Sequence, residues 1–211
     1  MKQLLPVLMT IAASIPGMAQ EPEVMNGNVN LISKEYDSLS INGGLTFENL
    51  SIKNLLIING RIQGKNLQCT IINSNGSLNV TGLQAQNIES HGTFLAKDID
   101  VTGESILRGT IEITNAKLNQ IKMSTTQTTF TNAEVRGNVI LENIDKASDH
   151  LGGSFPQPQP QVLKLKGKSL ILGDIIFENK GEVHVFDQAR IEGKVINATV
   201  VRKAHNLPDE Q

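Results

Sequence analysis

The sequence predicts an all-β fold: a single-stranded parallel β-helix, a solenoid with about 17 residues and three short strands per coil. Three observations support this fold. Apolar–x–apolar triplets recur from residue 39 onward, the triplets share a common period, and Gly and Asn stand between them. Ile, Leu and Val supply most of the apolar positions, because the 211 residues include no Trp, one Tyr and six Phe.

The period is visible in two independent series of triplets. Every third triplet starts at residue 39, 56, 72, 88, 106, 121 or 139, and a second series starts at 45, 62, 78, 94, 111 and 128. A triplet sends two apolar side chains to one face, because residues i and i+2 of a strand point the same way. One coil cannot cover its own apolar face, so the coils are expected to stack in parallel.

Gly and Asn occupy the intervals where the chain must turn, as at 42–44, 59–60, 75–76 and 137–138. Both residue types tolerate the left-handed backbone region that sharp corners use. Three alternative folds fit the pattern less well. A β-sandwich would have longer strands, spaced roughly 8 to 12 residues apart. Amphipathic helices would have apolar residues at i, i+3 and i+4. Pentapeptide-repeat solenoids would keep a stricter five-residue spacing of apolar residues than this chain does.

The N-terminus predicts export. Lys2 precedes an apolar run, and the small residues Gly17 and Ala19 stand before Gln20, so residues 1–19 have the pattern of a secretory signal peptide. The run is shorter than the ~20 residues that a membrane-spanning helix needs, and no other stretch qualifies. We therefore expect no membrane span in the mature chain and a location in the periplasm or outside the cell.

The rest of the chain divides into five segments. Residues 39–143 and 162–202 are expected to form coils, and residues 203–211 a polar tail. Residues 144–161 are rich in Pro and Gly, and proline cannot donate to a ladder, so this segment is predicted to be a long loop or an inter-block hinge. Residues 20–38 are expected to cap the first coil, with three apolar side chains covering it: Val29, Leu31 and Ile32.

The string LILGDIIFENKGEVHVFDQARIEGKVINATVV at 170–201 resembles the polymer-forming β-helix repeats of the bactofilin family, with GDI and GKV as corner phrases. Residues 39–141 share only the rhythm of that family. The resemblance implies a right-handed coil and end-to-end self-association. It implies no catalytic residues, and the chain departs from these cytoplasmic scaffold proteins through its export signal and its Pro-rich insertion.

The residues predict no catalytic, cofactor-binding or metal-binding site. None of the four His residues stands in a metal-ligand spacing, and Cys69 is expected to be a buried core residue because it fills an apolar slot of its triplet. Asp98 and Asp100 flank Ile99 and could share a face, where a solvated edge is favoured over a cation site. A polar stretch in which the apolar rhythm fails is the candidate binding patch: Ser124, Thr125, Thr126, Gln127, Thr128 and Thr129.

Composition narrows the function. A formal net charge of −2 and few aromatic residues argue against binding to nucleic acid. We expect an exported, non-enzymatic scaffold or adhesive surface of the bacterial envelope or the extracellular space. Its expected partner is an envelope or extracellular protein or glycan, or another copy stacked end to end. The alternative is a carbohydrate-active β-helix enzyme with a carboxylate site across coils.

Overall fold

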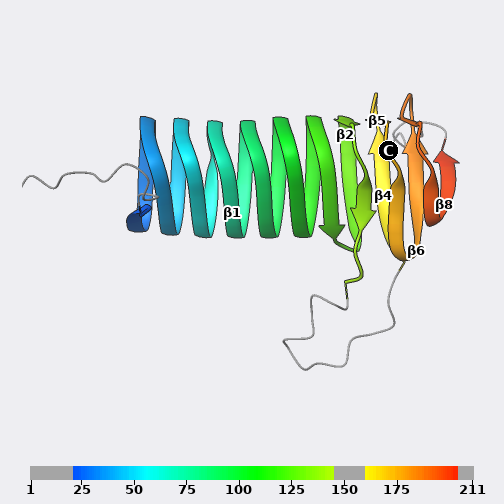
Figure 1. The fold of residues 1–211 in the computed structure, drawn as a ribbon, viewed down its shortest axis with the longest axis horizontal. Coiled ribbons are helices and arrows are strands. Elements are labelled where there is room, and N and C mark those ends of the chain that lie inside the picture. Colours follow the sequence, from blue (N-terminus) through cyan, green and yellow to red (C-terminus); the bar gives the residue numbers. More distant parts are fainter. Residues whose placement is uncertain (1–20, 145–159, 204–211) are drawn as a thin grey trace, which may run out of the picture.

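The protein is a parallel β-helix, as predicted (Figure 1). The computed structural model describes residues 21–144 and 160–203, and no helix occurs in these two ranges. The first strand, β1 (Glu23–Ser124), is extended chain that winds through successive coils before the shorter strands begin. These are β2 (Gln127–Val135), β3 (Val139–Leu141), β4 (Gln161–Lys166), β5 (Leu170–Ile171), β6 (Ile175–Phe186), β7 (Arg190–Ile191) and β8 (Val195–Lys203).

The pairing register confirms the predicted coil length for the first part of the stack. β1 pairs with β2 in parallel, with Ile111 opposite Thr128 and Leu118 opposite Val135, so partners are 17 residues apart. β1 also pairs with β3, where Ile121 lies opposite Val139. Residues one coil apart therefore lie on neighbouring strands, roughly 4.8 Å from each other along the stack.

The C-terminal coils vary in length. Leu163 lies opposite Val183 and Ile175 opposite Val195, so these partners are 20 residues apart, whereas Val183 lies opposite Val200, 17 residues later. The additional residues widen the corners: a turn at 166–169 is closed by a hydrogen bond from Ser169 N to Lys166 O (3.3 Å), and residues 178–180 are exposed. A coil can gain residues at a corner without changing which strand faces inward.

The coils on either side of the Pro-rich segment stack directly on one another. β2 pairs with β4, with Phe130 opposite Leu165, and β3 pairs with β6, with Leu141 opposite Phe177. The hydrogen-bonded ladder between strands is therefore continuous from the coil before the Pro-rich segment to the coil after it. The segment itself, at 145–159, lies outside the described residues, as do the predicted signal peptide and nearly all of the predicted polar tail.

The interior is a single stacked core of Ile, Leu, Val and Ala, with Phe94, Phe130 and Phe177 among its largest fully buried side chains. Two triplets are displaced by one residue from the sequence prediction. Ser105 and Leu107 face inward in place of Ile106, and Ile171 faces inward whereas Leu172 is 38% exposed. A one-residue slip moves a side chain to the opposite face, so these predictions were wrong.

Corner residues form two columns along the stack, of which the sequence predicted the glycine column but not the members of the Asn and Asp column. In one column, five glycines have φ between +113° and +144°, and a Cβ on any of them would come within 2.0–2.3 Å of the preceding glycine's carbonyl oxygen: Gly43, Gly60, Gly76, Gly92 and Gly109. In the other column, Asn and Asp adopt φ of +52° to +58° and bond to one another: Asn49, Asn66, Asp98, Asn115 and Asn132.

Residues 23–38 continue β1 as a coil of the stack, where a separate cap was predicted. Asn42 Nδ2 donates to Asn26 Oδ1 at 3.0 Å, the same contact that Asn59 makes with Asn42 one coil later. Leu31 is buried as expected, but Ile32 is 58% exposed. Among the described residues, this first coil is therefore the N-terminal end of the stack.

Candidate functional site: the two ends of the stack

The C-terminal end of the stack carries an unpaired edge and exposed apolar residues. β8 pairs with β6 alone, so the second edge of β8 has no strand partner among the described residues. Ile196 is 39% exposed and Val200 is 40% exposed on this strand. An open edge with apolar side chains is a template for a further strand.

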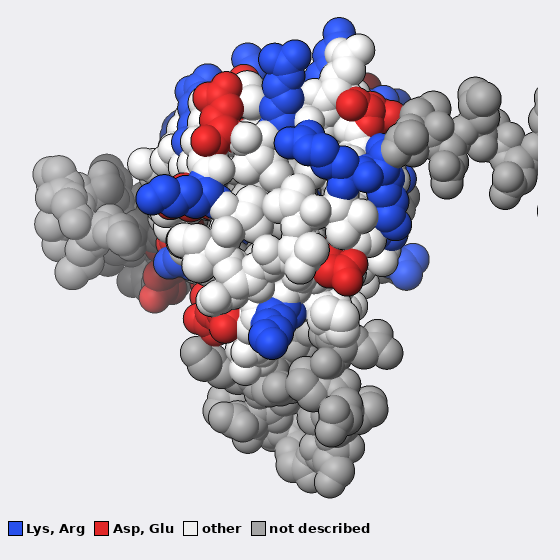
Figure 2. Space-filling view, turned by 90° about the vertical axis from the view of Figure 1, so that its right-hand side faces the viewer, with Lys and Arg blue, Asp and Glu red and all other residues white. Residues whose placement is uncertain are grey.

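Basic residues surround this end. Residues 187–203 hold four basic and two acidic side chains, a net formal charge of +2. Figure 2 faces the end of the stack and shows uncharged surface in the middle, with Lys and Arg at several places around it and fewer acidic side chains. Lys203 and Lys166 both lie about 6 Å from the centre of the Phe186 ring, at 6.0 and 5.8 Å.

The N-terminal end is also open, but acidic. Val24 is 59% exposed and Ile32 is 58% exposed there. Residues 21–38 hold four acidic side chains and Lys34, a net formal charge of −3. A hollow at this end is lined mainly by acids around one tyrosine: Glu21, Glu23, Glu35, Tyr36, Asp37 and Ser38. Burial, and then the charge of Glu23, raise the pKa of Tyr36.

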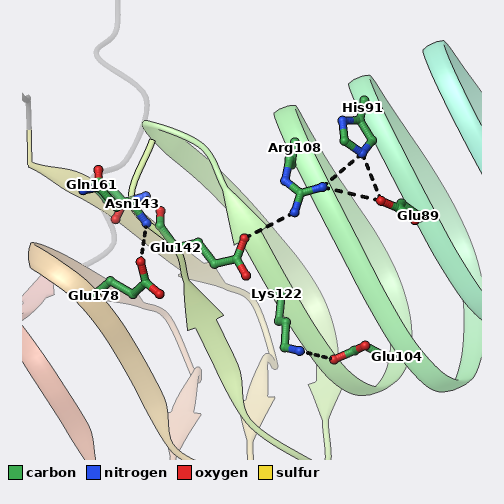
Figure 3. A network of polar contacts seen from close by, with 9 residues as sticks. All are labelled: Glu89, His91, Glu104, Arg108, Lys122, Glu142, Asn143, Gln161 and Glu178. Carbon is green, nitrogen blue, oxygen red and sulfur yellow. Dashed lines mark hydrogen bonds and ion pairs between the residues drawn. The ribbon is translucent and has the colours of Figure 1, made fainter. Parts of the chain in front are cut away.

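A polar network bridges coils near the base of the Pro-rich segment (Figure 3). Arg108 lies 3.5 Å from a Glu89 oxygen and 3.6 Å from a Glu142 oxygen, and its Nη1 is 3.0 Å from His91 Nε2. Gln161, which is 3% exposed, donates from Nε2 to the carbonyl oxygens of Thr125 (3.0 Å) and Glu142 (2.9 Å). These contacts hold the flanks of the segment to the stack.

The predicted binding patch is divided between the interior and the surface. Ser124, Thr125 and Thr128 are buried, with Thr128 only 1% exposed, and Thr128 Oγ1 donates to Ile111 O at 3.0 Å. Thr126 and Gln127 are exposed and Thr129 is half-buried. The apolar rhythm fails here because hydroxyl side chains fill inward positions, so the six residues do not form one exposed face.

The other residues considered in the sequence are dispersed. Cys69 is buried, and burial raises the pKa of its thiol to about 11, despite backbone hydrogen bonds that favour the thiolate. His184 Nε2 lies 2.6 Å from Glu182 and His91 Nε2 lies 3.1 Å from Glu89. Asp98 and Asp100 both line a groove on the side of the stack.

Residues 21–144 and 160–203 contain no group of three or more His, Cys, Asp and Glu side chains placed to hold a metal ion. The same two ranges contain no helix with the length and apolar character needed to cross a membrane.

Comparison of the chain with models of known protein families gave no match, and comparisons with curated proteins and with solved structures gave none either. The resemblance to bactofilins therefore stays a prediction.

The sequence predicted end-to-end association, but the opposite charges of the two ends escaped that prediction, although a signal was present. The summed charges of the terminal coils have opposite signs, and this is readable from the sequence once the coil boundaries are known. Those boundaries depend on residues 23–38 being a coil, which the weak apolar pattern before residue 39 did not reveal.

Proposed function

We propose that this protein is an exported, non-enzymatic scaffold that assembles by end-to-end stacking and presents its lateral faces as a binding surface. The observation that carries the proposal is the pair of open, oppositely charged ends. Exposed apolar residues at both ends and the unpaired edge of β8 give each copy two surfaces that another copy can extend.

Opposite charges favour one polarity of stacking. Joining the C-terminal end of one copy to the N-terminal end of the next places a coil of net charge +2 against one of net charge −3. Joining two N-terminal ends or two C-terminal ends would place charges of the same sign together, which costs free energy. Head-to-tail joining also keeps every strand parallel, as within the stack, and repeated heterologous contacts of this kind generate an open filament.

Export and the envelope or extracellular location rest on the sequence pattern of residues 1–19, and they remain proposals. An exported protein with a single cysteine cannot form an internal disulfide. Ladder hydrogen bonds and the stacked core therefore have to supply its stability, which suits a rigid rod that works through its surfaces.

The assembly is tested by light scattering and sedimentation of the protein lacking residues 1–19, over a range of concentration and salt. We expect species larger than a monomer that grow with concentration and dissociate as salt rises, because salt screens contacts between exposed charges. Filaments in electron micrographs would give the length distribution. A monomer that persists at high protein concentration and low salt would refute the assembly.

A matched pair of variants distinguishes specific contacts between the ends from nonspecific hydrophobic association. Val200→Lys changes an end residue that is 40% exposed and lies opposite the buried Val183, and Ile71→Lys changes a residue that is 39% exposed in the middle of the stack. We expect Val200→Lys to abolish assembly and Ile71→Lys to leave it unchanged. Equal effects of both variants would contradict the proposed end-to-end contact.

A further inference from the structure

A groove runs along one side of the stack, next to the corner column of Asn and Asp residues. It extends from Asn49 to Asn132 and has a volume of about 1080 Å³. Six corner residues line it, one per coil, so it is roughly 24 Å long at a coil spacing of about 4.8 Å. An opening of this length suits an extended ligand better than a compact one.

The floor of the groove consists of polar side chains that point outward from the strand after the corner. Four successive members of this row are Ser51, Gln68, Gln84 and Asp100, and Lys117 follows. Within residues 21–144 and 160–203, these side chains make no hydrogen bond or ion pair with protein. Elsewhere on the surface, charged residues do pair across coils, as Lys122 does with Glu104 at 2.7 Å.

A notch interrupts the corner column in the middle of the groove. Asn66 Nδ2 donates to Asn49 Oδ1 (2.7 Å) and Asn115 Nδ2 donates to Asp98 Oδ1 (2.8 Å), but the position between Asn66 and Asp98 is Gly82. A Cβ on Gly82 would lie 2.7 Å from Asn66 Oδ1. Because Gly82 has no side chain, the column of hydrogen-bonded corner side chains is broken between Asn66 and Asp98, and Asn66 Oδ1 lies at this gap.

The chemistry of the groove excludes several kinds of ligand. Most of its apolar members are buried, and Leu50, Leu67 and Leu83 are at most 1% exposed. Leu170, at the C-terminal end of the groove, is half-buried, so an apolar side chain of a peptide finds a contact only there. The strand edges along this side are paired between coils, so a peptide cannot add to the ladder. The charged side chains that line the groove are three acids (Asp98, Asp100 and Glu134) and two lysines (Lys117 and Lys168). This small acidic excess disfavours an acidic polymer, and the groove has neither the basic excess nor the aromatic residues of a nucleic-acid site.

An uncharged, hydroxyl-rich polymer is the ligand class that fits the hydrogen-bonding groups of the groove. Each hydroxyl both donates and accepts a hydrogen bond, and a carboxamide offers one acceptor oxygen and two donor hydrogens. Gln68, Gln84 and Asn66 repeat these groups along the groove at the spacing of the coils. Carboxylates such as Asp100 add strong acceptors for hydroxyl donors.

We propose that this groove binds a linear, uncharged glycan, seated over Gln68 and Gln84 and entering the notch at Gly82. The proposal deepens the binding-surface part of the proposed function and rests on it.

The test is a calorimetric titration of protein produced from the full-length sequence, with a panel of soluble hexasaccharides. The panel holds linear neutral glucans and a linear oligomer of N-acetylglucosamine, with hexagalacturonate as the acidic probe and an uncharged Ser/Gly/Thr peptide as the peptide probe. We expect one or more neutral glycans to bind and the other two probes not to bind.

Two groove variants and one control locate the binding. Gly82→Asn fills the notch, and it should fold because neighbouring corner residues of the column are already Asn with φ near +55°. Gln68→Ala with Gln84→Ala removes floor amides without touching the corner. Each hydrogen bond contributes about 1 kcal/mol, which corresponds to about fivefold in Kd. Gly82→Asn should therefore raise Kd about fivefold, and the double variant, which removes two amides, about 30-fold. Gln63→Ala, an exposed amide outside the groove, should leave Kd unchanged.

Three outcomes overturn the proposal: no neutral glycan binding up to about 10 mM, binding that neither groove variant weakens, or binding of the acidic or peptide probe in place of the glycans. Light scattering of the same samples separates this proposal from the scaffold. Loss of glycan binding in protein that still assembles counts against the groove alone, and glycan binding by a permanent monomer counts against the assembly alone.

Discussion

Gly76→Ala tests whether the glycine column sets the spacing of the coils. Gly76 has φ of +138°, and a Cβ there would lie 2.0 Å from the carbonyl oxygen of Gly60 and 2.8 Å from its carbonyl carbon. Both contacts are with backbone, so no side chain can rotate away to relieve them. The two coils would have to separate at this corner, against ladder hydrogen bonds on either side.

The expected cost follows from two contributions. An alanine held at this backbone angle loses about 1–3 kcal/mol through strain, and a methyl forced into packed backbone costs a further ~1–3 kcal/mol. Gly76→Ala should therefore lower the free energy of unfolding by about 2–6 kcal/mol. Gly82→Ala is the matched control, because its φ is +74° and its nearest atom is the end of the Asn66 side chain. It should cost only about 1–2 kcal/mol.

Equilibrium unfolding in guanidinium chloride, followed by far-ultraviolet circular dichroism, measures both changes. The midpoint is the safer readout, because stacked repeats can unfold in more than one step. A midpoint for Gly76→Ala at or above that of Gly82→Ala would refute the idea that backbone contact between glycines limits the spacing.

Two further predictions concern buried groups. Ser90 is 1% exposed and its Oγ has no hydrogen-bond partner, so Ser90→Ala should raise the free energy of unfolding by about 1 kcal/mol. Ser169→Ala should lower the free energy of unfolding, because Ser169 Oγ accepts a hydrogen bond from Ala133 N (3.2 Å). Chemical denaturation of both variants measures the two changes. The folded pKa of Cys69 is raised to about 11, so the unfolded thiol ionises first and stability should fall as pH rises from about 9 to 11. This loss should vanish in Cys69→Ala, and an equal loss in both proteins would contradict it.

The period and the inward positions were predictable because strand geometry alone fixes them. Residues two apart share a face, and corners need Gly or Asn, so the series from Leu39 to Leu141 could be read without knowing the partners of any strand. The two triplets that were misplaced by one residue follow corners that are one residue longer than the same corner in the preceding coil. After Val101 the next apolar residue in the sequence is Ile106, and only the burial of Ser105 and Leu107 shows which residues face inward.

Serine and threonine in the core explain why the candidate patch was misplaced. A hydroxyl faces inward where the strand continues but an aliphatic residue is absent, as Thr128 does beside Ile111. Composition cannot separate this case from an outward polar face, because both read as a gap in the apolar rhythm. The groove was likewise hidden, since it depends on which residues of different coils stand in one column, and the opposite charges of the two ends were hidden because they depend on the coil boundaries.

One corner of the stack explains both the Pro-rich insertion and the change of coil length. The glycine column ends at Gly109, and 17 residues later the position is Thr126, at the break between β1 and β2. Without close backbone contact between glycines, this corner is free to widen. The next turn at the same corner, between Leu141 and Gln161, carries the insertion, and the one after it, between Phe177 and Gly181, has exposed extra residues. Glycine thus keeps the early coils uniform, and its loss at one position allows the variation that follows.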